Sequence, residues 1–150
     1  MPTILLTFNP AARALYYSDE ALARLRALGS VRLHGHDTTL AGQALIAAAA
    51  DCEVIISDRQ TAGSADLFAA SPQLAVFMRC AMDIRNVDVA AASAAGVLVT
   101  HASAGFGTSV AEWVVGVMID LSRDISRSVL AYRDGVPPLV RMGRELRGSR

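Results

Sequence analysis

Residues 54–78 read VIISDRQTAGSADLFAASPQLAVFM, and this stretch decides the fold. It begins with an apolar run at 54–57, continues with a helix-forming segment at 64–70 and ends with a second apolar run at 74–78. Uninterrupted apolar runs of this length are typical of strands that are buried on both faces of a sheet. Two such strands joined through a helix pair in parallel by a right-handed crossover. The stretch therefore predicts one strand–helix–strand unit of a parallel sheet.

The same alternation extends outward along the chain in both directions. Further strands are predicted at 4–8, 31–33 and 97–100, and further helices at 11–28, 40–50 and 89–95. Strands that alternate with helices predict an α/β fold, here a flavodoxin-like, doubly wound, five-stranded parallel sheet with helices on both faces. We assign residues 1–107 to this domain.

Composition excludes several classes of protein. The 150 residues are 53% hydrophobic and 19% charged, which suits one folded domain and excludes intrinsic disorder. The 14 basic residues, all arginine, balance 14 acidic residues, and a net charge of zero argues against a nucleic-acid partner. Cys52 and Cys80 form no CxxC motif, so we expect reduced thiols. The first apolar run is too short for a signal sequence or a membrane span, which makes a cytoplasmic location the default expectation.

A long apolar helix is predicted after the sheet, over residues 108–134. Ser109-Val110-Ala111-Glu112 has the form of a capping box, and nothing breaks the pattern before Asp134-Gly135. Because apolar residues surround the axis of its first half, this helix should be buried on all sides, against a second domain or a second copy of the chain. Residues 135–150 show no helical or strand period and are expected to be a connector.

Candidate ligand-binding residues follow the strands. In open α/β sheets, ligands bind at the carboxyl ends of the strands, where Arg59, Arg79 and His101 are expected to lie. Guanidinium groups bind carboxylates through two parallel hydrogen bonds. An alternative of equal weight is that the arginines of the loop after the fourth strand, Arg79 and Arg85, pair locally with acidic neighbours. No metal site is predicted, because His34 and His36 have no third ligand at suitable spacing.

The glycine-rich segment Gly105–Val110 precedes the long helix, as a dinucleotide-binding fingerprint would. However, Val110 stands where the third small residue belongs, and no acidic residue closes a second strand about 20 residues further on. We interpret these glycines as a tight entry into the helix. No nucleophile with an activating base and no pair of acid/base carboxylates stands out, so the sequence predicts no catalytic residue.

Three motifs in order resemble one known family. They are the loop-and-strand region at 73–79, 86–92 and 96–100, the sequence Val110-Ala111-Glu112, and the phrase Met142-Gly143-Arg144-Glu145-Leu146-Arg147-Gly148. Together they resemble the D-isomer-specific 2-hydroxyacid dehydrogenases, including their Val-Ala-Glu start of the interdomain helix. The resemblance extends over the whole chain and is strongest from about residue 73 onward.

The resemblance implies the substrate-binding part of an NAD(P)-dependent oxidoreductase that interconverts a 2-hydroxy acid and a 2-keto acid. Family enzymes take their catalytic Arg, Glu and His from a later NAD-binding Rossmann domain, so this chain alone is expected to be inactive and to need that absent domain, with a homodimer as the expected assembly. The family's substrate-binding loop maps onto Cys80, Ala81, Met82 and Asp83. The cleft-lining segment maps onto His101 and Thr108, with Val110 near the nicotinamide of NAD or NADP.

The chain departs from the family pattern at the loop. Ala81 and Asp83 replace two glycines, Arg85 replaces an aspartate, and His101 begins the segment that replaces Asn-Thr-Pro-Gly. The Asp83 carboxylate would repel a substrate carboxylate unless Arg79 or Arg85 compensates. An alternative hypothesis is a self-contained flavodoxin-like binding or dimerisation module without enzymatic activity. A strand and Gly-x-Gly-x-x-Gly encoded after Arg150 would favour the dehydrogenase, and a stop codon would favour the module.

Overall fold

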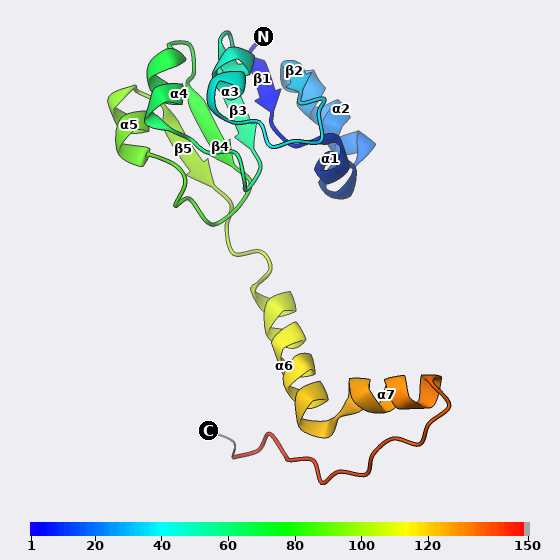
Figure 1. Ribbon diagram of the computed structural model, residues 1–150. Helices are drawn as coiled ribbons and strands as arrows, with labels where there is room; N and C mark the ends of the chain where they lie inside the picture. The colour runs from blue at the N-terminus through cyan, green and yellow to red at the C-terminus, as the bar shows by residue number, and fades with distance from the viewer. Residues whose placement is uncertain (149–150) are drawn as a thin grey trace. The chain divides into compact units, whose positions relative to one another are not determined.

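The five predicted strands form one parallel sheet in the computed structural model, which describes residues 1–148. The strands are β1 Thr3–Leu6, β2 Ser30–Leu33, β3 Val54–Ser57, β4 Val76–Arg79 and β5 Leu98–His101. Their order across the sheet is β2-β1-β3-β4-β5 (Figure 1). This order and the all-parallel pairing confirm the predicted α/β fold class.

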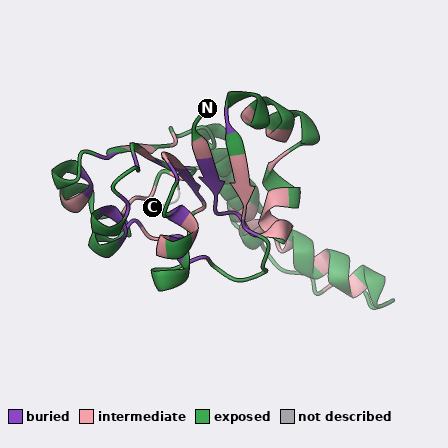
Figure 2. Cartoon of the chain, turned by 90° about the horizontal axis from the view of Figure 1, so that it is seen from above, coloured by how far each residue is buried: buried purple, intermediate pink, exposed green. Residues whose placement is uncertain are grey.

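Helices cover both faces of the sheet. Leu5 and Ile55 point to one face, where they pack in a cluster with residues of α3 Gly42–Ala49, α4 Ala65–Ala70 and α5 Val89–Ala94. Leu6 and Ile56 point to the other face, toward residues of α1 Pro10–Tyr16 and α2 Asp19–Leu28. Each fully buried aliphatic side chain contributes about 1.5–3 kcal/mol to the free energy of unfolding. Buried residues occur in the three central strands β1, β3 and β4, whereas the edge strands β2 and β5 have none (Figure 2).

The predicted helix at 11–28 is two helices. α1 ends at Tyr16, and Tyr17 adopts an extended backbone. The Ser18 hydroxyl then accepts a hydrogen bond from the Ala21 N–H and begins α2. A serine in this position satisfies one of the free donors of a helix start, and Asp19 adds a favourable charge in the first turn.

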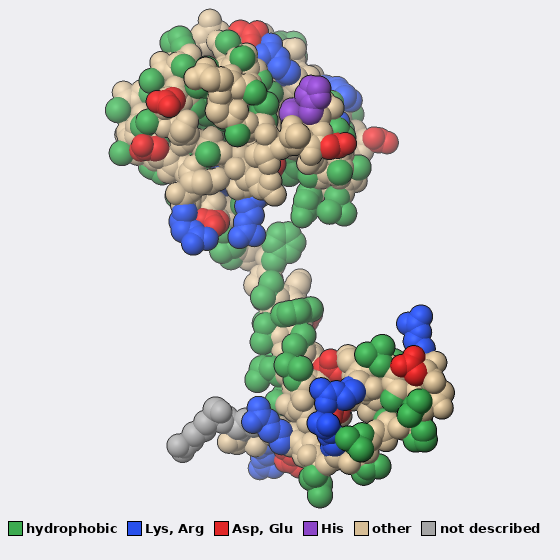
Figure 3. Space-filling model, viewed as in Figure 1, with side chains coloured by type: hydrophobic (Ala, Val, Ile, Leu, Met, Phe, Trp, Pro, Cys, Tyr) green, Lys and Arg blue, Asp and Glu red, His purple; other side chains and the backbone are tan. Residues whose placement is uncertain are grey.

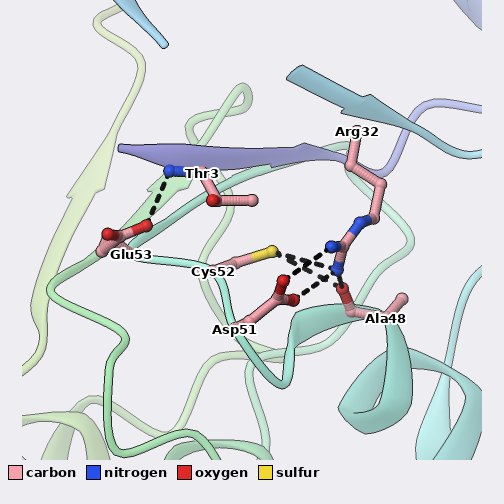
Figure 4. Close-up of polar contacts among 6 residues, drawn as sticks. All are labelled: Thr3, Arg32, Ala48, Asp51, Cys52 and Glu53. Atoms are coloured by element: carbon pink, nitrogen blue, oxygen red, sulfur yellow. Dashed lines mark hydrogen bonds and ion pairs between the residues drawn. The ribbon is translucent and has the colours of Figure 1, made fainter. Parts of the chain in front are cut away.

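One polar cluster fastens the edge strand β2 to the end of α3 (Figure 4). Both terminal nitrogens of Arg32 donate to the Asp51 carboxylate, at 2.7 and 2.9 Å, and Nη1 also donates to the Ala48 carbonyl at 2.6 Å. Close by, the Glu53 carboxylate accepts a hydrogen bond from the Thr3 N–H at 2.6 Å. Because an edge strand has a neighbour on one side only, these side-chain bonds add to its attachment.

The sheet register aligns the carboxyl ends of the last three strands. Ser57 of β3 lies opposite Arg79 of β4, and Arg79 lies opposite His101 of β5. The loops that follow these strands therefore leave the sheet at the same edge.

The chain divides into a first unit, Met1–Ser103, and a second unit, Ala104–Arg150, so the first unit ends a few residues before the predicted boundary at 107. The second unit contains α6 Gly107–Arg123 and α7 Ile125–Arg133. The prediction of one unbroken helix over 108–134 is wrong, because Asp124 adopts a left-handed conformation with φ 54° and separates the two helices. The predicted capping box is also wrong: α6 begins at Gly107, which places Ser109 inside its first turn.

Residues 135–148 form no helix or strand, and the last two residues of the predicted connector, 149 and 150, lie outside the described residues. No helix within residues 1–148 is long and apolar enough to cross a membrane.

Candidate functional site

The loop that follows β4 has unused backbone donors. Its first N–H, that of Cys80, donates to the Ser57 carbonyl at 3.0 Å, and the Ala81 carbonyl accepts from Ala102 at 3.2 Å. The next three N–H groups, those of residues 81–83, form no hydrogen bond within the described part of the chain. Successive free N–H groups in a loop bind anions such as carboxylates.

Arg79, the last residue of β4, is almost completely buried, and its side chain forms hydrogen bonds with the loops after β3 and β4. One terminal nitrogen, Nη1, donates to the backbone carbonyls of Asp58 and Thr61, and the other, Nη2, donates to the Asn86 side chain. Burial lowers the pKa of the guanidinium, and Nε is buried with no hydrogen-bond partner in the described residues. The side chain is 1% exposed, so the prediction that Arg79 contacts a ligand needs correction. Its role here is to join the loops after β3 and β4.

Asp83 and Arg85 form a closed ion pair on the loop surface. The Arg85 side chain donates to both carboxylate oxygens, at 2.9 and 2.7 Å, and the Arg85 N–H adds a third bond at 3.0 Å. The Arg85 side-chain bonds, followed by its backbone bond, hold the pKa of Asp83 well below its ordinary value. The sequence left open whether Arg79 or Arg85 compensates the Asp83 charge. In the structure, Arg85 forms this ion pair.

A pocket of about 330 Å³ opens at this edge of the first unit, lined by Arg59, Asp83, Arg85 and Asn86. In Figure 3, two basic groups flank an acidic one at the edge of this unit. Since Asp83 is paired with Arg85, and the Arg59 side chain forms no hydrogen bond or ion pair with the described residues, Arg59 supplies the net positive charge. This arrangement favours an anion in the pocket.

Two residues of this loop, Cys80 and Met82, have less polar side chains. The Cys80 thiol lies 3.8 Å from the Tyr17 hydroxyl, and Met82 is 57% exposed. Burial raises the pKa values of both the Cys80 thiol and the Tyr17 hydroxyl. Both groups therefore stay protonated at neutral pH, and neither is an activated nucleophile.

The structure brings Arg59 and the loop 80–83 to one edge, and His101 ends the neighbouring strand. The His101 side chain is exposed, and its Nδ1 lies 2.9 Å from the carbonyl of Ala102. Thr108 and Val110, the residues expected near a cofactor, lie exposed in the first turn of α6 in the second unit.

Sequence reasoning missed the residues that shape the loop after β3. The Asp58 carboxylate accepts bonds from the N–H groups of Gln60 and Thr61, at 3.2 and 2.7 Å. The Thr7 hydroxyl accepts bonds from the Asp58 N–H and the Thr61 hydroxyl, both at 3.0 Å. An aspartate directly after a strand is typical of such a turn, because its side chain can bond the backbone two residues further on, as Asp58 bonds Gln60. Asn86, the partner of Arg79, carried no comparable signal.

Metal-ligating side chains do not gather at this edge. Within residues 1–148, no group of three or more His, Cys, Asp and Glu side chains is placed to hold a metal ion. Within the described residues, this edge of the parallel sheet therefore offers free backbone donors in the loop after β4 and a pocket lined by the unbonded guanidinium of Arg59. These features define a class of protein: an α/β domain with an anion-favouring pocket at the carboxyl edge of its sheet.

Comparisons with known proteins identify the family. The sequence profile of the catalytic domain of the D-isomer specific 2-hydroxyacid dehydrogenases matches residues 11–137. The chain belongs to this family of NAD(P)-dependent dehydrogenases.

One curated relative is D-3-phosphoglycerate dehydrogenase of Rattus norvegicus, 36% identical over 111 residues, which are 73% of this chain and 21% of that protein. The chain thus spans about a fifth of the length of this relative.

Solved structures share the fold. An acyclic imino acid reductase in complex with NADPH and D-Arg superimposes with a TM-score of 0.80 and 14% identity, covering 96% of this chain and 45% of the reductase. The NAD⁺-bound 3-phosphoglycerate dehydrogenase of Entamoeba histolytica gives a TM-score of 0.64 and 16% identity, covering 97% and 43%.

Proposed function

We propose that this chain supplies the substrate-binding part of an NAD(P)-dependent enzyme that interconverts a 2-hydroxy acid and a 2-keto acid. The observation that carries the proposal is that the N–H groups of residues 81–83 form no hydrogen bond with the described residues, while Asp83 lines a pocket together with the Arg59 side chain. The substrate carboxylate accepts hydrogen bonds from these N–H groups. Arg59 adds a positive charge, and Met82 offers apolar contact to the rest of the acid.

Each further residue has a role in this proposal. Cys80 and Ala81 fix the start of the loop through their backbone bonds, and the Arg85 pair neutralises Asp83 beside the incoming anion. His101 borders the site from the neighbouring strand. Thr108 and Val110 approach the nicotinamide of NAD or NADP, which a further domain of the whole protein binds and which supplies the hydride acceptor or donor. NADPH and NAD⁺ each accompany a structural neighbour, so both cofactors belong in the test.

Titration of the ¹⁵N-labelled chain with pyruvate, glyoxylate and 3-phosphoglycerate tests the binding proposal. We expect saturable shifts of the amide signals of residues 81–83. The variant Arg59→Gln should lower the affinity obtained from these shifts several-fold, because one charge-assisted contact is lost. Arg24→Gln is the matched control, since Arg24 is also an exposed arginine with no bond to the described residues. Shifts that are absent, or that respond equally to both variants, would refute the proposal.

We also propose that the 150-residue chain alone transfers no hydride, because the family resemblance places the catalytic Arg, Glu and His in another domain. Incubation with NADH or NADPH and a 2-keto acid should leave the reduced nicotinamide unconsumed. Consumption above the rate without protein would contradict this view of the chain.

The proposed assembly is a homodimer, for which α6 provides the surface. Val110, Trp113, Val114 and Met118 follow one another at helical spacing along α6, and the second unit leaves them all exposed. Adjoining exposed apolar side chains are typical of surfaces that contact another protein.

A further inference from the structure

A second pocket, in the second unit, lies where α6 turns into α7. Its volume is about 420 Å³, and four arginines and one aspartate contribute its charged lining: Arg123, Arg127, Arg141, Arg144 and Asp124. The lining therefore carries a formal charge of +3. Basic groups gather on the face of the second unit that is seen in Figure 3.

The backbone brings these arginines together from separate segments. The left-handed conformation of Asp124 ends α6 and redirects the chain into α7, which carries Arg127. The segment 141–144 returns to the last turn of α6, where the Arg144 N–H donates to the Ser122 carbonyl at 3.1 Å. Gly143 permits this approach, because a Cβ at this position would lie 2.7 Å from the same carbonyl oxygen. The arginines at 141 and 144, although they lie in the segment that was expected to be a connector, therefore line a pocket.

The single carboxylate does not satisfy the four guanidinium groups. Asp124 lies 3.6 Å from Arg127 Nη1 and 3.8 Å from Arg141 Nε, distances beyond those of strong charge-assisted hydrogen bonds. The side chains of Arg123 and Arg144 form no hydrogen bond or ion pair with the described residues. Four guanidinium groups around one cavity repel one another, and an anion relieves this repulsion.

We infer that this pocket binds a small phosphate-bearing molecule. Guanidinium groups match phosphate oxygens through paired hydrogen bonds, and several converging arginines suit a group with more than one negative charge. The volume lies within the range of small-molecule pockets and exceeds that needed by a simple monovalent ion. The site belongs to the second unit and uses none of the residues of the substrate loop, so it does not depend on the proposed function.

Titration of the ¹⁵N-labelled chain with inorganic pyrophosphate tests the inference. We expect saturable shifts at residues 122–127 and 141–144 that chloride at equal ionic strength does not produce. A parallel titration with ADP distinguishes the source of the phosphate: tighter binding than pyrophosphate indicates a nucleotide, and equal or weaker binding indicates a free phosphate compound.

The variant Arg123→Gln/Arg144→Gln should weaken pyrophosphate binding at least about tenfold, the effect of losing one charge-assisted hydrogen bond or more. These two arginines are chosen because their side chains form no bond that holds the described structure, and circular dichroism checks that the variant folds. Arg24→Gln/Arg26→Gln removes the same charge from exposed positions of α2 and should leave binding unchanged. Equal losses in both double variants, shifts that chloride reproduces, or no shift at the pocket would overturn the inference.

Discussion

At the scale of single residues, the Arg79 side chain has the largest consequence for the proposed binding loop. We predict that Arg79→Met lowers the free energy of unfolding by about 2–4 kcal/mol, because the carbonyls of Asp58 and Thr61 lose a charged donor. Urea denaturation measures the change. Arg59→Met, at an exposed position without bonds to the described residues, should stay within about 0.5 kcal/mol of the parent chain. Similar stability of the two variants would contradict the supporting role of Arg79.

The Cys80 thiol provides a prediction about pH. Burial raises the pKa of this thiol from its ordinary value of 9.0, so the reactive thiolate is scarcer at neutral pH than in free cysteine. Alkylation of Cys80 by iodoacetamide should therefore be slow at neutral pH and should accelerate as the pH rises above 9.0. Mass spectrometry of the labelled chain gives the rates.

Matched variants assign this reactivity. Cys52 is 0% exposed and should not react in the folded chain, so Cys52→Ser should keep the profile and Cys80→Ser should abolish it. A neutral-pH rate equal to that of free cysteine would show that the thiol is not held in its protonated form.

Among the connecting elements, the contact between Gly63 and the segment at 86–88 limits the space for side chains. The Gly63 N–H donates to Asn86, and its carbonyl accepts from Asp88. A Cβ at residue 63 would lie 2.9 Å from Val87 Cγ1 and 3.0 Å from Phe68 Cζ. We predict that Gly63→Ala costs about 1–3 kcal/mol, through overpacking.

The matched control for this prediction is Gly35→Ala, because a Cβ at residue 35 meets no atom within 4 Å. Its unfolding free energy should stay within about 0.5 kcal/mol of the parent value. If Gly63→Ala proves equally mild, the segment at 86–88 moves more easily than its hydrogen bonds indicate.

The start of α7 depends on a side chain of α6. The Asp120 carboxylate accepts bonds from the Ser126 N–H at 2.6 Å and from the Ser126 hydroxyl at 2.7 Å, and these bonds lower the pKa of Asp120. Asp120→Ala should therefore accelerate hydrogen exchange in α7 several-fold, since a helix-start donor loses its acceptor. Asp134→Ala, at the end of α7, is the control.

The expected pH dependence has a defined sign. Because the pKa of Asp120 is lower in the folded chain, its stabilising effect is present above the ordinary pKa of 3.8 and is lost as the pH falls through the lowered value. The capping role would be contradicted if the protection of α7 against hydrogen exchange were unchanged in Asp120→Ala. It would also be contradicted if that protection increased on acidification.

The sequence predicted elements better than it predicted their interruptions. The strand at Val54–Ser57 matches its apolar run, because a strand buried on both faces must be apolar throughout. The break at Ser18 was missed although serine, aspartate and glutamate in succession are typical of a helix start. The break at Asp124 was missed because a single left-handed residue leaves no apolar pattern. Both interruptions involve side-chain hydrogen bonds over three to six positions, from Ala21 to Ser18 and from Ser126 to Asp120, and such bonds leave no trace in the apolar pattern.

The same limit applies to the candidate site. Its expected position at the carboxyl edge rested on the alternation of strands and helices, and the structure places Arg59 and Asp83 in one pocket at this edge. That Arg59 and the loop at 80–83 bind a ligand stays a prediction. The burial of Arg79 did not follow, since a charged side chain is normally exposed and its acceptors are carbonyls distant in the sequence.

At the scale of the whole molecule, the proposed homodimer depends on the apolar stripe of α6. Val114 and Met118 lie one turn apart on this stripe, at 41% and 46% exposure, whereas Ile119 has the same 41% exposure on the opposite side of the helix. We predict that the chain self-associates through the stripe and that Val114→Glu/Met118→Glu makes it monomeric, because two charges would be buried in the contact. Sedimentation velocity over a range of concentrations measures the assembly.

Ile119→Glu tests whether the stripe itself, and not the apolar character of α6 in general, forms the contact. This variant should remain associated, because its charge lies away from the stripe. Trp113, the single tryptophan of the chain, gives an independent signal: its emission should shift to shorter wavelength as the parent chain associates and should not shift in the double variant. A parent chain that stays monomeric at every concentration would refute the homodimer. Dissociation by Ile119→Glu alone would place the contact on the other side of α6.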